Sequence, residues 1–296
     1  MLLLLFARRF GHKVALRGES PLTHEWYKPK WKLAIRKWIL GKWLFKNIDY
    51  AFYIGTHNKE FYQYYGVPDD KLKFTPYAVD NKRFRAAYEQ LKDKKEELRT
   101  QLGFAANKKT ILFSGKFTDK KRPMDLLMAF HHLNDPTAQL VFLGEGELRD
   151  RMETYIKKFN LQNVVITGFV NQSDIVKYYA AADVFVMCSG VGETWGLSVN
   201  EAMNFNLPII VSDITGCSVD LVKEGVNGFI FKSGDVEGLT DYISLITKIT
   251  QIEISQLGIK SAEFIKNYSY EIIEKSLQSL TLQKAIAGNK HYELQD

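Results

Sequence analysis

The chain has 296 residues, of which 46% are hydrophobic and 25% charged, a balance typical of soluble globular proteins with one large or two smaller domains. Its two cysteines, Cys188 and Cys217, lack the spacing of a zinc site or a disulfide framework, which favours a cytoplasmic location. The apolar start, Met1–Phe6, is too short to span a bilayer, and its charges, Arg8 and Arg9, follow it rather than precede it as in a signal peptide. We interpret this start as the end of a core helix.

The net charge of +6 is unevenly placed, because the segment from Trp26 to Ile48 contains no acidic residue. Its basic residues are Lys28, Lys30, Lys32, Arg36, Lys37, Lys42 and Lys46, and its large apolar residues include Trp26, Trp31, Trp38, Trp43, Leu44 and Phe45. Tryptophan favours the headgroup level of a bilayer and lysine is attracted to anionic lipid, so residues 26–48 favour a helix that lies on an anionic membrane surface. The alternative is a solvated helix whose tryptophans face the core. Nucleic acid is not expected as a partner, because no nucleic-acid-binding signature accompanies the charge.

Short apolar runs alternate with helical patterns in residues 1–80. We predict strands at His12–Leu16, Tyr50–Ile54 and Leu72–Pro76, with the basic helix after the first strand and a short helix at Asn58–Tyr65 after the second. This alternation indicates parallel βαβ units. Because three strands are too few for a complete open sheet of this kind, we expect a truncated domain.

Residues 81–109 are highly charged with a mostly helical pattern, and we expect them to connect two bodies. The alternation is clearer from Thr110 onward. Strands are predicted at Ile111–Phe113, Leu140–Leu143, Val164–Ile166, Val184–Met187, Ile209–Val211 and Phe229–Phe231. Helices are predicted at Met124–Leu133, Leu148–Phe159, Asp174–Tyr179, Leu197–Phe205, Val236–Ile249, Gln256–Asn267 and Tyr270–Ile286. Continuous apolar runs of this kind fit strands covered on both faces, so residues 110–268 should form a doubly wound α/β domain. Residues 269–296 are expected to pack back on the N-terminal part.

Polar and glycine residues follow several of these strands, at the edge of an open α/β sheet where ligands bind. Gly115 and Lys116 follow the first strand of the second domain, with Lys121 a few residues later. A glycine turn lets the backbone approach a phosphate, and lysines act on it as point charges. The alternative for this segment alone is a solvated basic loop. Gly168 and Phe169 follow the third strand, where Phe169 would line a base pocket or pack in the core.

The segment Ser189–Gly196 is the richest of these loops, and it precedes the helix that carries Glu201. Its glycines bring backbone N–H groups near Gly196 and Leu197 to a helix start, where a diphosphate is favoured. The Glu201 carboxylate can accept two hydrogen bonds side by side, which matches the vicinal hydroxyls of a ribose, and Glu193 can grip a sugar in the same way. The alternative is that these carboxylates stabilise the start of the helix.

Nearly the whole chain resembles the retaining glycosyltransferases of family 4, which have the GT-B fold of two Rossmann-like domains, and the resemblance is strongest from Gly115 to Phe231. The family hallmark is a pair of glutamates with seven residues between them, matched by Glu193 and Glu201. The flanking segments Leu207–Ser212 and Glu224–Phe229 also match. The upstream part resembles the end of the family's acceptor domain through Arg17–Ser20, Ile54–Thr56 and Pro76–Asp80, without the histidine that many relatives place after the first of these.

The resemblance implies roles for individual residues. Lys116 and Lys121 would hold the donor diphosphate, with Lys116 where the family more often has arginine. Glu201 would hold the ribose and Glu193 the donor sugar, with the backbone of Gly196 and Leu197 at the phosphates. Gly168 and Phe169 resemble the base-binding turn. Lys116, Lys121 and Glu193 are therefore the predicted catalytic residues.

The implied reaction transfers a hexose from a nucleoside-diphosphate sugar to an acceptor hydroxyl with retention. We expect it to need no metal and no cofactor besides the donor. The implied setting is surface polysaccharide or glycolipid synthesis, with a saccharide or lipid-linked acceptor, in the cytoplasm or at the inner face of the membrane. Two alternatives stay open: a catalytically incomplete fragment that binds the nucleotide sugar, and a sugar-nucleotide epimerase of the same fold.

Overall fold

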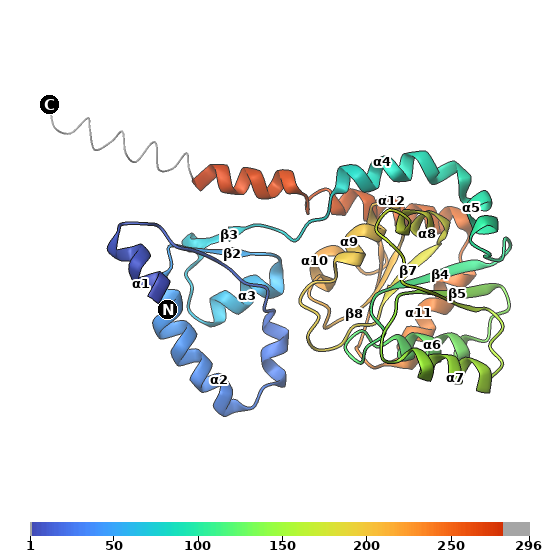
Figure 1. The fold of residues 1–296 in the computed structure, drawn as a ribbon, viewed down its shortest axis with the longest axis horizontal. Helices are drawn as coiled ribbons and strands as arrows, with labels where there is room; N and C mark the ends of the chain where they lie inside the picture. Colours follow the sequence, from blue (N-terminus) through green and yellow to red (C-terminus); the bar gives the residue numbers. More distant parts are fainter. Residues whose placement is uncertain (1, 281–296) are drawn as a thin grey trace. The chain divides into compact units, whose positions relative to one another are not determined.

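The computed structural model of this protein describes residues 2–280, with side chains from residue 6 onward. The described chain forms two compact units (Figure 1). Unit 1 comprises residues 2–78 and the segment from residue 267, and unit 2 comprises Val79–Lys266, so residues 81–109 belong to unit 2 by their contacts. A helix covers residues 270–280 in unit 1, and the rest of the predicted helix Tyr270–Ile286 lies outside the described residues.

Unit 1 is built on three parallel strands within the described residues: β1 (Ala15–Arg17), β2 (Tyr50–Tyr53) and β3 (Leu72–Phe74), in the order β1-β2-β3. Its helices include α1 (Leu2–Arg9) before the first strand and α3 (Thr56–Tyr64) after the second. The sheet and α3 enclose a small core rich in aromatic residues: Phe45, Ile48, Ala51, Phe61, Tyr62, Tyr65, Val67 and Leu72. The predicted alternation of this part is confirmed, with strands a few residues shorter than expected.

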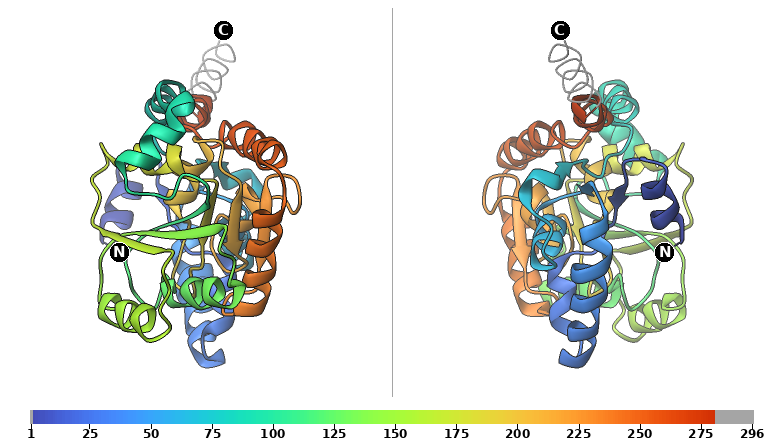
Figure 2. Two further views of the ribbon diagram at one scale, coloured as in Figure 1. Left: turned by 90° about the vertical axis from the view of Figure 1, so that its right-hand side faces the viewer. Right: turned by 90° about the vertical axis from the view of Figure 1, so that its left-hand side faces the viewer.

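The basic segment of unit 1 is helical, and we call residues 26–47 the basic arm. The arm begins with the last two residues of the 3₁₀ turn η1 (Leu22–Tyr27). It continues as α2 (Lys30–Arg36), the π-helix η2 (Lys37–Leu44) and the 3₁₀ turn η3 (Phe45–Asn47). Figure 1 and the right-hand view of Figure 2 show the helical part of this arm (blue) projecting from the rest of unit 1. Within the described range, no helix combines the length and the apolar character that crossing a bilayer requires.

Unit 2 contains a fully parallel sheet, six-stranded within the described residues. Its strands are β4 (Lys109–Ser114), β5 (Ala138–Leu143), β6 (Val164–Gly168), β7 (Val184–Met187), β8 (Ile209–Ser212) and β9 (Gly228–Phe231). Their order is β6-β5-β4-β7-β8-β9, so the chain winds outward from β4 in one direction and then from β7 in the other. This is the order of doubly wound dinucleotide-binding folds. Each predicted strand is present, extended by up to three residues.

Helices cover both faces of this sheet. Figure 1 shows α6 (Pro123–Leu133), α7 (Arg149–Lys158) and α11 (Val236–Lys248) on one face, and α8 (Ile175–Ala181), α9 (Leu197–Met203) and α12 (Gln251–Ile265) on the other. The central strands are buried along their whole length for this reason, as their unbroken apolar runs predict. A large core cluster lies between the sheet and the helices α6 and α11.

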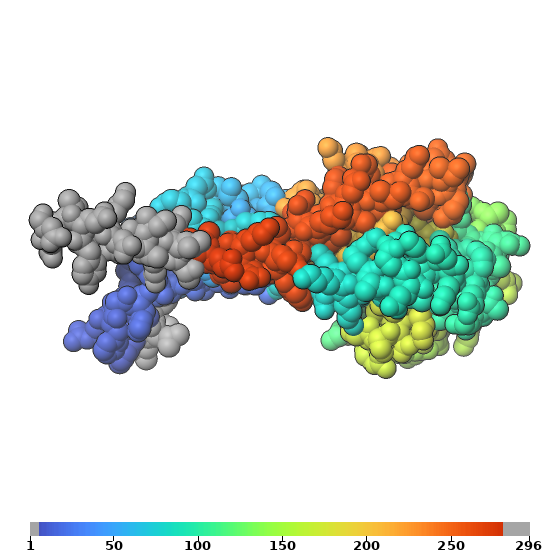
Figure 3. Space-filling view, turned by 90° about the horizontal axis from the view of Figure 1, so that it is seen from above, coloured from blue at the N-terminus to red at the C-terminus, as the bar shows by residue number. Residues whose placement is uncertain are grey.

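The charged segment at the start of unit 2 forms α4 (Asn81–Leu91), the 3₁₀ turn η5 (Lys92–Lys94) and α5 (Lys95–Gln101). Asp80 caps α4, because its carboxylate accepts a hydrogen bond from the backbone N–H of Arg83. In Figure 3, α4 and α5 (teal) lie on the surface of unit 2 beside α12 (orange). The Asn81 side chain donates to the Ile265 carbonyl over 3.3 Å, which joins the first of these helices to the end of α12.

Most predicted helices of unit 2 begin and end within two residues of the prediction, but two helices differ more. Helix α12 begins at Gln251, five residues before the predicted start, because Thr250 and Glu253 form a capping box. The short helix α10 (Ser218–Leu221) is not predicted, since four residues are too few to show a helical period.

A buried ion cluster fastens α5 to the sheet. The Asp183 carboxylate, 2% exposed, accepts hydrogen bonds from Arg99 Nη2 (2.5 Å), Lys95 Nζ (2.6 Å) and the Thr110 backbone N–H (2.7 Å). Burial would raise the pKa of Asp183, but the charges of Lys95 and Arg99, with these hydrogen bonds, outweigh it and lower the pKa. Because the folded pKa lies below the unfolded one, the stability that Asp183 contributes is present above the unfolded pKa and is lost as the pH falls.

We therefore expect Asp183→Asn to lower the free energy of unfolding by about 3 kcal/mol at neutral pH, because it leaves Arg99 buried without its carboxylate. Urea unfolding between about pH 7 and pH 3 measures this, and the difference between variant and parent should shrink below about pH 4. Asp174→Asn is the control, since Asp174 pairs with Lys177 on the solvated surface of unit 2. A difference that does not change with pH would contradict the assigned role of the Asp183 charge.

Candidate functional site

The strand order of unit 2 creates one place where loops leave the sheet in opposite directions. Strands β4 and β7 are neighbours, and the chain after β4 crosses toward β5 while the chain after β7 crosses toward β8. Ligands of open α/β sheets bind at the carboxyl ends of the strands at such a switch point. Gly115–Arg122 leaves the sheet after β4 and Ser189–Gly196 leaves it after β7, so the two richest predicted loops meet there.

The two loops are joined directly. The Gly190 backbone N–H donates to the Lys120 carbonyl over 2.7 Å. A side chain at Gly190 would place its Cβ 3.2 Å from Arg122 Cδ, so glycine lets the loops approach. Arg122 adopts a left-handed backbone conformation (φ +50°) just before α6, and its guanidinium donates to the Asp125 carboxylate over 2.6 Å.

Glu193 lies where the two loops meet. Its side chain is 7% exposed and forms an ion pair with the ammonium of Lys121. The Ser189 hydroxyl lies 3.3 Å from Glu193 Oε2, and Lys120 Nζ lies 3.8 Å from the same oxygen. The structure therefore brings together two of the predicted catalytic residues, Lys121 and Glu193, and adds a second cation that the sequence prediction did not assign.

Glu201 lies in α9 and is 8% exposed. The buried Tyr179 hydroxyl donates to Glu201 Oε2 over 2.8 Å, and the Gln172 amide donates to Oε1 over 3.2 Å. Burial, followed by the negative charge of Glu201, raises the pKa of Tyr179 well above its usual value, while a hydrogen bond with Ser114 acts the other way. Tyr179 therefore stays protonated and donates to the Glu201 carboxylate.

The Glu193 and Glu201 groups are connected through adjacent residues at the end of β4. The Ser114 side chain lies beside Tyr179, and the Tyr179 hydroxyl holds Glu201. At the next residue, the Cβ position of Gly115 lies 3.7 Å from Lys121 Cδ, and Lys121 holds Glu193. Four predicted site residues (Gly115, Lys121, Glu193 and Glu201) thus belong to one contiguous set of contacts at the switch point.

The other predicted site residues border this set or stand apart from it. Gly196 is buried with φ +107°, and Leu197 after it is 41% exposed. Gly168 has φ +79°, and Phe169 beside it is 76% exposed, which excludes the core-packing alternative for Phe169. The Lys116 side chain is exposed and makes no hydrogen bond or ion pair with any residue that the structure describes.

Three residues that support the site were not predicted: Gln172, Tyr179 and Ser189. Tyr179 was assigned only to a helix, in a run where the sequence pattern gives its type but not the direction of its hydroxyl. The backbone of Ser189 is held in place by β8, because the Ser189 carbonyl accepts a hydrogen bond from the Ser212 hydroxyl over 2.5 Å. Its position at the end of a buried strand is the signal that could have identified it. Among residues 6–280, no three His, Cys, Asp or Glu side chains are grouped to hold a metal ion.

Unit 2, which contains this site, is the part of the chain that matches a known protein family. The family model described as "Glycosyl transferases group 1" matches residues 94–268. An uncharacterized glycosyltransferase of Methanocaldococcus jannaschii is 32% identical over 168 residues, covering 55% of this chain and 42% of that protein. Alpha-monoglucosyldiacylglycerol synthase of Acholeplasma laidlawii is 26% identical over 228 residues, covering 75% of this chain and 55% of that protein. The chain thus spans about half the length of these curated relatives.

The fold is similar to solved structures over nearly the whole chain. HepE of Anabaena, crystallised in complex with UDP, superposes with a TM-score of 0.77 at 17% identity, covering 95% of this chain and 75% of that chain. The fold is GT-B, as the sequence predicts.

Gly196 offers a test of how tightly the site is built. A Cβ there would lie 2.6 Å from Met187 Sδ and 3.2 Å from Thr215 Cγ2, at a φ of +107°. Gly196→Ala should therefore lower the free energy of unfolding by about 3 kcal/mol, from backbone strain and overpacking together. Gly225→Ala is the matched control, because Gly225 also has a positive φ but has open space around its Cβ position. Thermal and urea unfolding measure both, and equal losses would mean that Met187 and Thr215 move aside.

Proposed function

Because the chain belongs to the glycosyl transferases of group 1, we propose that it transfers a hexose from a nucleoside-diphosphate sugar to an acceptor hydroxyl, with retention of the anomeric configuration. One observation carries the proposal: Lys121, Glu193 and Glu201 belong to one set of contacts at the switch point of the doubly wound sheet. This is the place where such folds bind nucleotides.

The charges of the loops suit a diphosphate leaving group. In the transfer, the bond between the sugar C1 and the diphosphate oxygen breaks, a bond from C1 to the acceptor oxygen forms, and the acceptor hydroxyl gives its proton to the departing diphosphate. Negative charge develops on the diphosphate as the first of these bonds breaks. Lys116, Lys120 and Lys121 lie on one short loop and can oppose that charge in place of a metal. We propose that Lys116 and Lys121 contact the diphosphate and that the backbone at Gly196 and Leu197 contributes N–H donors.

The ion pair between Lys121 and Glu193 gives the site a defined resting arrangement. Glu193 holds the Lys121 ammonium, and the Lys121 side chain passes Gly115, so this charge is positioned before the donor arrives. A group held in place in this way needs little reorganisation during the reaction. The remaining oxygen of Glu193 can accept hydrogen bonds from hydroxyls of the transferred sugar.

Glu201 is suited to bind the ribose. Tyr179 and Gln172 each donate to a different oxygen of this carboxylate, which fixes its plane and leaves further lone pairs for two hydroxyls. Phe169, 76% exposed beside Gly168, offers an aromatic face for the base.

We also propose an acceptor connected with a membrane, a lipid-linked or surface saccharide, and docking on an anionic membrane surface through residues 26–48. The exposed tryptophans and lysines of the basic arm support this setting. Of the relatives, alpha-monoglucosyldiacylglycerol synthase carries a glycolipid product in its name.

Replacing Lys121 tests the central charge. Lys121→Ala should lower turnover by about 100-fold or more, because removing one preorganised donor at a developing negative charge costs on that order. Transfer of labelled sugar from a panel of nucleoside-diphosphate sugars measures turnover, and urea unfolding shows that the variant folds. Lys260→Ala serves as the control, since Lys260 pairs with Glu263 on the surface of α12.

Unchanged turnover in Lys121→Ala would remove this residue from the mechanism. Donor binding by the parent chain without any transfer would instead favour the binding-only alternative, and an epimerised donor would favour the epimerase. Analysis of the anomeric configuration of the product by NMR tests retention directly.

Tyr179→Phe tests whether Glu201 recognises ribose. Losing the hydroxyl that orients Glu201 should weaken binding of a ribonucleoside diphosphate by about 10-fold, the equivalent of one buried hydrogen bond. Binding of the 2′-deoxyribonucleoside diphosphate should weaken less. The ratio between the affinities for the ribose and deoxyribose ligands should therefore become smaller. Calorimetry with both ligands measures this, with Tyr178→Phe, the half-buried neighbour on α8, as the control. An equal loss for both ligands would assign Tyr179 a role in packing alone.

A further inference from the structure

The basic arm exposes an apolar stripe that its own domain does not use. The inward side of the helix already packs on the core of unit 1 through Leu40 and Leu44. On the outward side, Trp31, Ile35 and Trp38 are 62%, 51% and 64% exposed. Their spacing of four and three residues places them on one helical face. A row of large exposed apolar side chains at helical spacing marks an interaction surface.

The charge around this stripe identifies the kind of partner. Glu25, the acidic residue directly before the arm in the sequence, is buried. Its negative charge is neutralised, because Lys28 (2.7 Å) and Arg36 (3.1 Å) form ion pairs with it. The remaining lysines of the arm make no ion pair with a described residue: Lys30, Lys32, Lys37, Lys42 and Lys46. Unpaired cations beside exposed tryptophans match an anionic lipid surface, where the rings lie at headgroup level and the lysines face negative charge.

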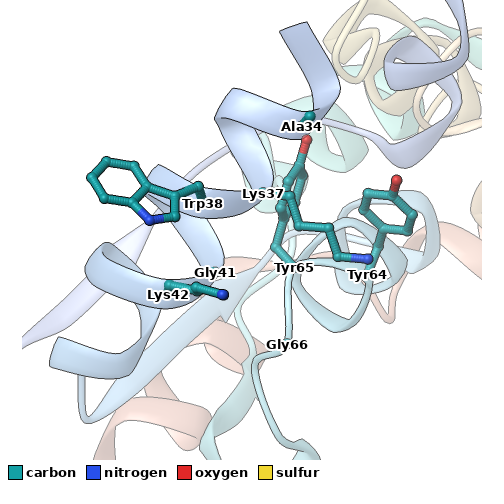
Figure 4. A pocket seen from close by; sticks show the side chains of 8 residues that line it. All are labelled: Ala34, Lys37, Trp38, Gly41, Lys42, Tyr64, Tyr65 and Gly66. Carbon is teal, nitrogen blue, oxygen red and sulfur yellow. The ribbon is translucent and has the colours of Figure 1, made fainter. Parts of the chain in front are cut away.

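A pocket lies at one side of this stripe, between η2 and the end of α3 (Figure 4). Its volume is about 470 Å³, within the range of small-molecule sites. Lys37, Trp38 and Lys42 line it from the arm, and Tyr64 lines it from α3. The walls of the pocket are therefore mainly apolar, and two lysine side chains lie among its lining residues.

The π-helical turn explains why both lysines reach the same pocket. In an α-helix, residues five apart would point in directions roughly 140° apart. The wider turn of η2, with hydrogen bonds between residues five apart, brings Lys37 and Lys42 to one side. Lys37 Nζ lies 5.3 Å from the centre of the Tyr64 ring, and Figure 4 shows its side chain extended toward that ring. This cation–π contact holds one ammonium at the pocket.

We propose that this pocket binds the phosphate headgroup of an anionic phospholipid, with Lys37 and Lys42 at the phosphate and Trp38 at the level of the glycerol and upper acyl chain. The inference rests on the proposed docking of residues 26–48 at a membrane and goes beyond it, because it assigns a specific headgroup site. If the arm bound only through its overall positive charge, each of its lysines would contribute equally to membrane binding. A headgroup site instead gives Lys37 and Lys42 a larger contribution than the other lysines.

The test compares two double variants with the same change in charge. Lys37→Gln with Lys42→Gln removes the pocket lysines, and Lys30→Gln with Lys32→Gln removes two exposed lysines of α2 that do not line the pocket. General attraction predicts about a 30-fold loss of vesicle binding for either pair. We expect the pocket pair to lose at least about 10-fold more than the control pair, the equivalent of one further charge-assisted hydrogen bond.

Binding is measured by sedimentation of the full chain with phosphatidylcholine vesicles that contain about one-third phosphatidylglycerol, a mixture with a negative surface potential. Circular dichroism and calorimetry with a nucleoside diphosphate check that each variant folds and that the site in unit 2 is intact. Equal losses for the two pairs would overturn the headgroup site and leave membrane docking in place. No vesicle binding by the parent chain would overturn both, without bearing on sugar transfer. Tight binding of free glycerol 3-phosphate by a chain that ignores vesicles would assign the pocket to a soluble phosphate instead and overturn the lipid proposal.

Discussion

The ion pair between Lys121 and Glu193 is the contact on which the site depends, because it joins the two loops that leave the sheet at its switch point. A parallel sheet that winds in two directions must leave a crevice between β4 and β7. The cationic loop after β4 and the carboxylate after β7 neutralise each other in part, and Lys116 and Lys120 add further positive charge to the first of these loops.

The second carboxylate is held in a different way, and the difference suits a different task. Glu193 is paired with a cation, Lys121, and the pair holds both side chains where the two loops meet. Glu201 accepts hydrogen bonds from two neutral donors, Tyr179 and Gln172, which fix the plane of its carboxylate. A carboxylate with a fixed plane can accept hydrogen bonds from a rigid pair of hydroxyls, which fits the ribose role proposed for Glu201. A carboxylate that positions a cation fits the role proposed for Glu193 beside the diphosphate.

Much of unit 2 could be predicted from the sequence because its strands are short, wholly buried and apolar, so each leaves an unbroken run such as Leu140–Leu143. Glu193 and Glu201 could be predicted as site residues because they match the family's pair of glutamates with seven residues between them. The residues that orient them could not, because Tyr179 and Ser189 act through the direction of a hydroxyl, which depends on packing between elements far apart in the chain. The start of α12 was missed for a local reason: the capping box at Thr250 lies outside the apolar period that defines the helix.

The basic arm shows the opposite relation between sequence and structure. Its composition suggested a surface role or a core role, and composition alone could not separate them, because a helix with apolar residues on two sides fits both. The structure separates them by using one side for the core of unit 1 and leaving the tryptophans on the other exposed. Glu25 is what makes this possible. Glu25 forms ion pairs with Lys28 and Arg36, so the inner side of the arm can pack on the core of unit 1. The lysines on the outer side form no ion pair with a described residue. A single buried carboxylate thus divides one helix into a structural side and a side available to a partner.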